Sequence, residues 1–144
     1  LYKELGGKLQ LAVWDFNNGF DNYQWFRTET DALHTVENSW FKRLWQDETF
    51  REHVCERYRQ LRKTTLADEH IAEKIASYQA ELGAAVDRNF KVWGYSFDEA
   101  LLAGTSKDGT SRDIRSYEEA MKQLTDTIRE RLAYLDKELG GNLE

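Results

Sequence analysis

Ser116 to Gly140, SYEEAMKQLTDTIRERLAYLDKELG, is the stretch that decides the fold class of this 144-residue chain. Ser116 and Glu119 stand three residues apart, which is the spacing of a capping box at a helix N-terminus. Apolar residues then recur at steps of three and four, on one face of a helix: Ala120, Met121, Leu124, Ile128, Leu132, Leu135 and Leu139. Gly140 follows as a stop signal. The pattern predicts one long amphipathic helix that packs its apolar face on other elements.

Two helices are predicted from residue 38 onward. Either Asn38 or Ser39 suits the cap of the first, whose apolar stripe is Trp40, Phe41, Leu44 and Trp45. Asp47 suits the N-cap of the second, in which apolar residues recur at helical steps: Phe50, Val54, Tyr58 and Leu61. The other face of the second helix carries Arg51, Arg57, Arg59, Arg62 and Lys63. We expect that face to be solvated and partly paired with Glu52 and Glu56.

A third helix is predicted from Thr65 and Asp68 to about Val92. Its inner stripe is Ile71, Ile75, Tyr78, Leu82, Ala85 or Val86, and Phe90. Gly83 lies inside this pattern, where a glycine costs about 1 kcal/mol relative to alanine. Farther along, Ser96 and Glu99 predict a capping box for a short helix that ends near residue 103. Residues 104–115, rich in Ser, Thr, Asp and Gly, predict a loop.

Residues 1–16 have the pattern of a β-hairpin with a turn at Gly6 and Gly7. Two strands alone are marginal in water, so we expect them either to lie on the helices or to form the edge of a larger sheet. Residues 17–37 are a candidate metal-binding or contact loop, because they carry aromatic residues without clear periodicity. The chain is thus predicted to be one mainly α domain. A helical bundle of three or more long helices spans residues 38–139, after the small N-terminal β-hairpin, and residues 140–144 form a tail.

The composition argues against several classes of function. Only 20 basic residues stand against 26 acidic ones, a net charge of −6, whereas general binding to the nucleic acid backbone depends on clustered Lys and Arg. A local basic patch stays open as an alternative. No apolar run is long enough to span a membrane, and the sequence has no Walker loop, GxGxxG loop or GxSxG elbow.

Cys55 is expected to be a buried or half-buried filler in a helix. The three histidines have no metal-site spacing, and the last two are expected to be exposed: His34, His53 and His70.

Polar side chains follow an apolar run in residues 9–22, LQLAVWDFNNGFDN. In an extended chain Asp15 and Asn17 point the same way, while Phe16 points into the core. Oxygen ligands suit Mg²⁺ or Ca²⁺, so Asp15 is the leading candidate metal ligand, with Asn17 beside it. The alternative is a capped turn, which such a run often forms. An EF-hand loop is excluded, because Phe20 and Phe26 occupy its glycine and final carboxylate positions.

Several spaced motifs cover nearly the whole chain. They are a strand pair from Tyr2 to Leu11 leading to Val13-Trp14-Asp15-Phe16, Trp40 to Leu44 with Asp47 and Phe50, Arg57-Tyr58 with Leu61-Arg62, Asp87 to Phe90 with Trp93, Tyr117 to Glu119, and Arg131 to Asp136. In this order they resemble the C-terminal part of the CotH family, the spore coat protein H-like atypical protein kinases. The resemblance implies the C-terminal lobe of an atypical kinase-like fold. It also suggests a place in the spore coat, on the bacterial cell surface or outside the cell.

In that family a Trp-Asp-x-Asp motif ends a strand and its first Asp holds metal, a role that carries over to Asp15. The resemblance therefore implies ATP- and Mg²⁺-dependent transfer of phosphate to Ser or Thr of a partner protein. Asn17 stands where the family has its second Asp, which removes one charge from the site. The family's nucleotide lobe and catalytic-loop Asp and Asn lie upstream of the strand at Leu1. We therefore expect no catalytic residue and no tightly bound cofactor in this chain.

Three hypotheses remain open at this point. The preferred one is the C-terminal helical portion of a CotH-like kinase that is inactive alone. The second is a pseudokinase or binding module. In that case Asn17, in place of the second Asp, indicates a degenerate metal site, and the aromatic residues 20–26 form a contact surface. The third is a plain helical interaction domain that resembles the family only in its scaffold. In each case the partner is a protein, either as substrate or as structural partner.

Overall fold

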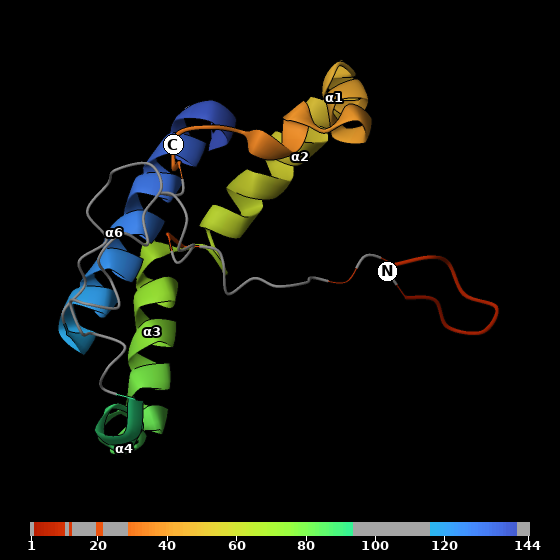
Figure 1. The fold of residues 1–144 in the computed structure, drawn as a ribbon. Coiled ribbons are helices and arrows are strands. Elements are labelled where there is room, and N and C mark those ends of the chain that lie inside the picture. The colour runs from red at the N-terminus through yellow and green to blue at the C-terminus, as the bar shows by residue number, and fades with distance from the viewer. Residues whose placement is uncertain (1, 11, 13–19, 22–28, 94–115, 141–144) are drawn as a thin grey trace.

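The computed structural model describes residues 2–10, 12, 20–21, 29–93 and 116–140 (Figure 1). Helices make up nearly all of its regular structure, so the predicted mainly α class is confirmed. The elements are η2 (His34–Glu37), α1 (Ser39–Trp45), α2 (Glu48–Arg62), α3 (Asp68–Leu82), α4 (Ala85–Trp93), α6 (Tyr117–Leu135) and η4 (Asp136–Gly140). η2 is a short 3₁₀ turn, and η4 is a π-helical turn that continues α6.

Three of the predicted helix starts are confirmed by capping hydrogen bonds. The Asn38 side chain accepts from the backbone N–H of Trp40 at 3.3 Å, and that of Asp47 accepts from Phe50 at 2.9 Å. The Ser116 hydroxyl accepts from the Glu119 N–H at 3.1 Å. Each bond satisfies one of the N–H groups that have no partner within the helix. The expected start of the third helix at Thr65 is wrong, since α3 begins at Asp68 after Ala67, without a side-chain cap.

Gly83 ends α3 instead of lying inside one helix that runs to Val92. Its φ of 42° and ψ of −129° depart from the helical region, and α4 starts two residues later at Ala85. Glycine adopts such a conformation without the steric penalty that a Cβ brings, which is why helices often stop at glycine. The prediction treated this glycine as a tolerated weakness. In the structure this glycine separates α3 from α4.

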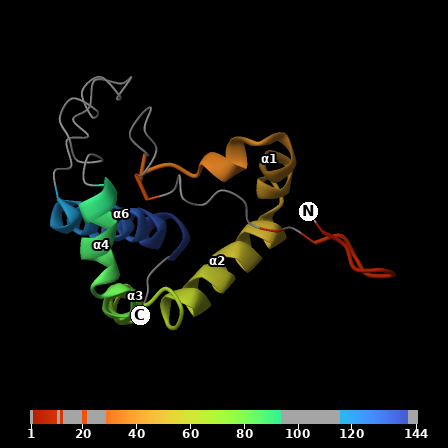
Figure 2. The ribbon, with the colours of Figure 1, turned by 60° about the horizontal axis from the view of Figure 1, so that its bottom comes forward.

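The three long helices α2, α3 and α6 form an open arrangement (Figures 1 and 2). The C-terminal part of α2 packs against η4, and the buried apolar residues of the described chain lie on α2, α6 and η4: Tyr58, Leu132 and Leu139. A groove of about 350 Å³ separates α3 from α6. The predicted stripe of α6 is buried or half-buried throughout, whereas that of α3 is half-buried only at Ile71 and Ile75, and Tyr78 and Leu82 are exposed. The chain therefore has its core around the end of α6.

The predicted N-terminal hairpin is not confirmed. Among residues 2–10 a single antiparallel bridge joins Tyr2 to Gln10, with N–H to carbonyl distances of 3.0 and 2.8 Å. Gly6 turns the chain at a φ of 75°, as a tight turn requires. The described residues contain no β-strand, and this segment stands away from the helices in both views (Figures 1 and 2). Of the two alternatives, packing on the helices is thus not what these residues show.

Two further predictions fall on residues that the structure does not describe. These are the short helix that starts after Ser96 and the loop over 104–115. Within the described segments, no helix is long and apolar enough to cross a lipid bilayer.

Candidate functional site

The two predicted metal ligands, Asp15 and Asn17, lie outside the described residues. The metal site therefore stays a prediction, and the structure defines only what flanks it. The chain is described again at Phe20 and Asp21, and then from residue 29 onward. Across the described parts of the chain, no group of three or more His, Cys, Asp or Glu side chains has the arrangement of a metal site.

Phe20 and Asp21 form a turn in an unusual backbone conformation. Their φ angles are 56° and 61°, in the left-handed region that favours glycine. A left-handed conformation costs a non-glycine residue about 1–2 kcal/mol. Asp tolerates this region better than most residues, whereas a bulky Phe visits it rarely. Contacts from outside the turn must therefore stabilise it.

Gln123 of α6 supplies such a contact. Its side-chain nitrogen donates to the backbone carbonyl of Asp21 and to the Asp21 carboxylate, both at 2.9 Å. The two residues are 102 positions apart in the sequence, and both are half-buried. An amide NH₂ carries two hydrogens, so one side chain can make both bonds at once. The sequence analysis missed this residue, since an isolated Gln on a helix carries no signal of its partner.

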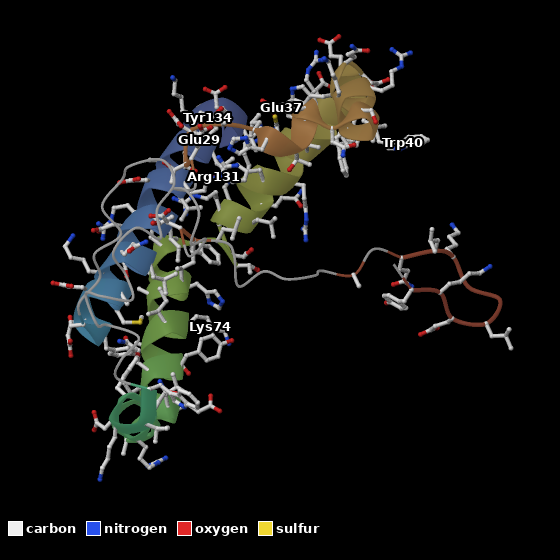
Figure 3. The ribbon with its side chains drawn as sticks, in the orientation of Figure 1. Glu29, Glu37, Trp40, Lys74, Arg131 and Tyr134 are labelled. Atoms are coloured by element: carbon white, nitrogen blue, oxygen red, sulfur yellow. The ribbon has the colours of Figure 1, made fainter. Side chains whose placement is uncertain are left out.

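A second contact between α6 and the N-terminal part comes from Arg131. Its guanidinium donates to the carbonyl oxygens of Thr30 at 2.9 Å and Ala32 at 2.6 Å. The same guanidinium lies 5.5 Å from the ring centroid of Tyr134, within range of a cation–π contact. Figure 3 shows Arg131 and Tyr134 on α6 beside the segment that carries Glu29. Thr30 and Ala32, in the last part of the predicted contact loop, are therefore held on α6.

A third cluster joins α2 to the end of α6. Arg62 makes a bidentate pair with Asp136, at 2.8 Å from Nε and 3.1 Å from Nη2, and Nη1 also bonds Asp68 at 2.8 Å. The Tyr58 hydroxyl donates to Asp136 at 2.6 Å. The Arg62 side chain is only 14% exposed, so the prediction that it lies on a solvated face is wrong. We call Tyr58, Arg62 and Asp136 the α2–α6 network.

The network shifts the pKa values of two of its members, Tyr58 and Arg62. Burial, followed by the hydrogen bond to Asp136, raises the pKa of Tyr58 above its usual value. Burial alone lowers the pKa of Arg62, but its hydrogen bonds to Asp68 and Asp136 outweigh that effect and raise the pKa. Tyr58 is thus a neutral donor and Arg62 a cation at neutral pH. The hydrogen bonds of this network join α2 to the end of α6.

Other side chains singled out by sequence are placed as expected. Cys55 is half-buried in α2, and His53 and His70 are exposed. On the exposed face of α2 the predicted pairing is confirmed for Arg59, which bonds Glu56 at 3.0 Å and lowers the pKa of that carboxyl. The remaining histidine, His34, lies 3.6 Å from Glu29 on the surface.

Comparison with known protein families gives a match. The family model described as CotH kinase protein matches residues 1–135, a span that contains Asp15, Asn17 and the contacts that Gln123 and Arg131 make from α6. No curated protein and no solved structure matches the chain. A family match over this share of the sequence establishes membership, and it confirms the resemblance seen in the spaced motifs. The chain therefore belongs to the CotH kinase protein family.

Proposed function

We propose that this chain is the C-terminal helical portion of a CotH-like kinase that transfers phosphate from ATP to Ser or Thr of a partner protein. The observation that carries the proposal is the family match over residues 1–135. It includes the one stretch whose residues suit a metal, Asp15 and Asn17. We further propose that residues 1–144 by themselves are catalytically inactive.

The donor set at the candidate site fits a hard cation. A carboxylate and an amide carbonyl are oxygen ligands of the kind that Mg²⁺ prefers, although Asn17 brings no charge. Bound there, Mg²⁺ would neutralise charge on the phosphates during transfer. In the proposed kinase the role of α6 is to support this stretch, because Gln123 and Arg131 bind residues that follow it.

The proposed inactivity of the isolated chain rests on the requirements of phosphoryl transfer. The reaction depends on a cradle that positions the γ-phosphate and on a residue that accepts the substrate hydroxyl proton. The sequence offers neither a glycine-rich phosphate loop nor an Asp-x-x-x-x-Asn catalytic loop. One acidic position and a helical platform are what these residues contribute to the proposed enzyme.

A pseudokinase or helical interaction module is the second candidate. Two observations favour it: Asn17 replaces the expected second Asp, and large aromatic side chains are exposed on short helices. Trp40, at the start of α1, is 81% exposed, and its side chain points away from the helices (Figure 3). Trp93 on α4 is 51% exposed. Exposed aromatic residues of this size are common in protein contacts.

Phosphate transfer by the full-length parent protein tests the proposal. Asp15→Asn should reduce transfer by about a thousandfold or more, because a lost metal ligand costs several kcal/mol of transition-state stabilisation. Asn17→Ala should cost much less, since this residue is already neutral. If Asp15→Asn keeps wild-type turnover but melts at a lower temperature, Asp15 is a turn cap and the metal role is wrong. A wild-type parent that binds ATP but transfers no phosphate would favour the pseudokinase.

A further inference from the structure

α3 is a long helix that packs closely against none of the other described helices. It has 15 residues, and none of them is buried. A helix of this length is stabilised in proteins mainly by burying its apolar face. The apolar stripe of α3 runs through Ile71, Ile75, Tyr78 and Leu82, and the last two are 58% and 51% exposed. The described part of the chain therefore leaves this stripe largely uncovered.

The groove between α3 and α6 lies along the first half of the stripe (Figure 1). Ile71 and Ile75 line it on one side, and Ile128 and Leu132 line it on the other. Its volume of about 350 Å³ accommodates a few apolar side chains. The stripe continues beyond the groove, and from Ile71 to Leu82 it spans roughly 16 Å, three turns of helix. An apolar surface of this length suits a partner helix that binds through side chains three and four residues apart.

The charges around the groove indicate the sign of that partner. Along α3 four acidic residues, all exposed, stand against a single lysine. α6, the other wall, is nearly balanced, with four acidic and three basic residues. At the end of the groove near α2, the carboxylates of Asp68 and Asp136 share one guanidinium, that of Arg62, at 2.8 Å each. A partner with Lys or Arg beside its apolar face is complementary to this surface.

We propose that the stripe of α3, together with the groove beside α6, docks a basic amphipathic helix of a partner protein. Apolar side chains of that helix fill the groove at Ile75 and cover the stripe as far as Leu82. Its basic side chains lie beside the carboxylates of α3. Asp68 is 71% exposed, so it can bind a second cation while it keeps its bond to Arg62. The proposal does not depend on phosphate transfer by the parent protein, because no residue of the candidate metal site takes part.

The test is binding of two fluorescein-labelled model peptides to the 144-residue chain, measured by fluorescence anisotropy. Both peptides have about 18 residues, five turns of helix, with leucines at steps of three and four. One carries lysines on its polar face and the other carries glutamates. The dissociation constant of the lysine peptide should be at least about tenfold lower than that of the glutamate peptide. Equal binding of the two peptides, or binding of neither, overturns the proposal.

Ile75→Glu tests the groove itself. It places a carboxylate among apolar side chains, so it should weaken binding of the lysine peptide by at least about tenfold, the usual effect of losing an interface anchor. A purely electrostatic attraction to the net charge of −6 predicts the opposite result, because the variant is more acidic. Ala80→Glu is the matched control, since Ala80 is exposed on α3 outside the stripe and the groove. It should bind at least as tightly as the wild type, and equal binding by the two variants overturns the proposal.

Melting curves from circular dichroism show whether each variant is folded. Leu82→Glu is a second variant on the stripe, at a position that is already exposed, and it should also weaken binding of the lysine peptide. Sedimentation equilibrium of the chain alone tests a second copy as the occupant. A dimer that Ile75→Glu dissociates and Ala80→Glu preserves would assign the stripe to that copy and overturn the proposed partner. Binding by the wild type and Ala80→Glu, with loss in both stripe variants, supports the proposal.

Discussion

α6 and the turn that continues it bind distant segments in two different ways. At the C-terminal end, Asp136 pairs with Arg62 and Tyr58 through side chains only, at distances of 2.6 to 3.1 Å. Earlier along the helix, Gln123 and Arg131 donate chiefly to backbone carbonyls of residues 21, 30 and 32. The first contact depends on the identity of every partner. The second depends mainly on the path of the bound segment, and among its acceptors only the Asp21 carboxylate is a side chain.

This difference suggests a division of roles. Side-chain pairing between partly buried charged groups holds α2 against the end of α6 in one arrangement. Binding to carbonyls holds a segment whose side chains are left available for other work. A helix that binds the backbone after Asp15 and Asn17 can support a site without restricting the chemistry of its side chains. The two regions should therefore respond differently to mutation.

The largest effect is expected for Asp136→Ala in the α2–α6 network. It leaves the Arg62 guanidinium, 14% exposed, without its bidentate partner, and breaking a buried pair costs about 3–5 kcal/mol. Asp136 is 27% exposed and Arg62 keeps its bond to Asp68, so we expect a loss of about 2–3 kcal/mol in the free energy of unfolding. Urea denaturation followed by circular dichroism measures it.

Lys137→Ala is the control for this variant. It is the next residue, 81% exposed, and its pair with Glu138 is 3.9 Å long, so its effect should stay within about 0.5 kcal/mol. Equal stability of Asp136→Ala and Lys137→Ala would show that the network is an ordinary surface pair, and the contrast between the two regions would disappear.

Sequence reasoning predicted the local features of this fold well. The helix caps and the apolar stripes of α2 and α6 depend on residues within one or two turns of each other, so the sequence pattern is enough to predict them. The confirmed caps are Asn38, Asp47 and Ser116. Gly83 was missed because a glycine in a helical pattern is compatible with both a weak helix and a break. The residues around Gly83 do not distinguish between the two, and the structure shows a break.

The long-range contacts could not be predicted in the same way. Arg62 and Asp136 are 74 residues apart, and on the sequence Arg62 is one of five basic residues on a helix face. Nothing local distinguishes it from Arg59, which is paired within α2. The family resemblance included both Arg62 and Asp136 in its motifs without saying that they meet. Gln123 had no signal, because its acceptors include a backbone carbonyl that every residue possesses.

An intermediate effect is expected for Tyr58→Phe, which removes the hydroxyl that donates to Asp136 at 2.6 Å. At neutral pH the loss should be about 1–2 kcal/mol, because Asp136 retains Arg62 as a donor. The pKa of Tyr58 is raised above its ordinary value of 10.0 in the folded protein, by burial first and then by Asp136.

The pH dependence of this variant is set by that raised pKa. Below pH 10 the phenol is neutral in both states, and its contribution to stability is fully present. As the pH rises above 10, the phenol ionises in the unfolded chain while it stays neutral in the folded one, so the free energy of unfolding falls. Tyr58→Phe should show a shallower fall, and the gap between the two proteins should narrow in denaturation series at increasing pH. Parallel curves would mean that Tyr58 ionises equally in both states.

The smallest effect is expected for Arg131→Ala, which removes the donor to the carbonyls of Thr30 and Ala32. Water can replace that donor, since Thr30 and its neighbours are exposed or half-buried, so the loss should be about 0.5–1 kcal/mol. The change should be local. Amide hydrogen exchange should become faster in the segment around residues 30–37, while exchange within α2 and α6 stays near the wild-type rate.

Arg129→Ala provides the comparison on the same helix. Its side chain is 73% exposed and pairs with Asp126 one turn away, so it should change neither the stability by more than about 0.5 kcal/mol nor the exchange of residues 30–37. The outcome that breaks the contrast is an Arg131→Ala variant that loses as much stability as Asp136→Ala. In that case the binding of residues 30 and 32 to α6 would be part of the core of the fold. The segment after the predicted metal ligands could then not loosen without unfolding the whole chain.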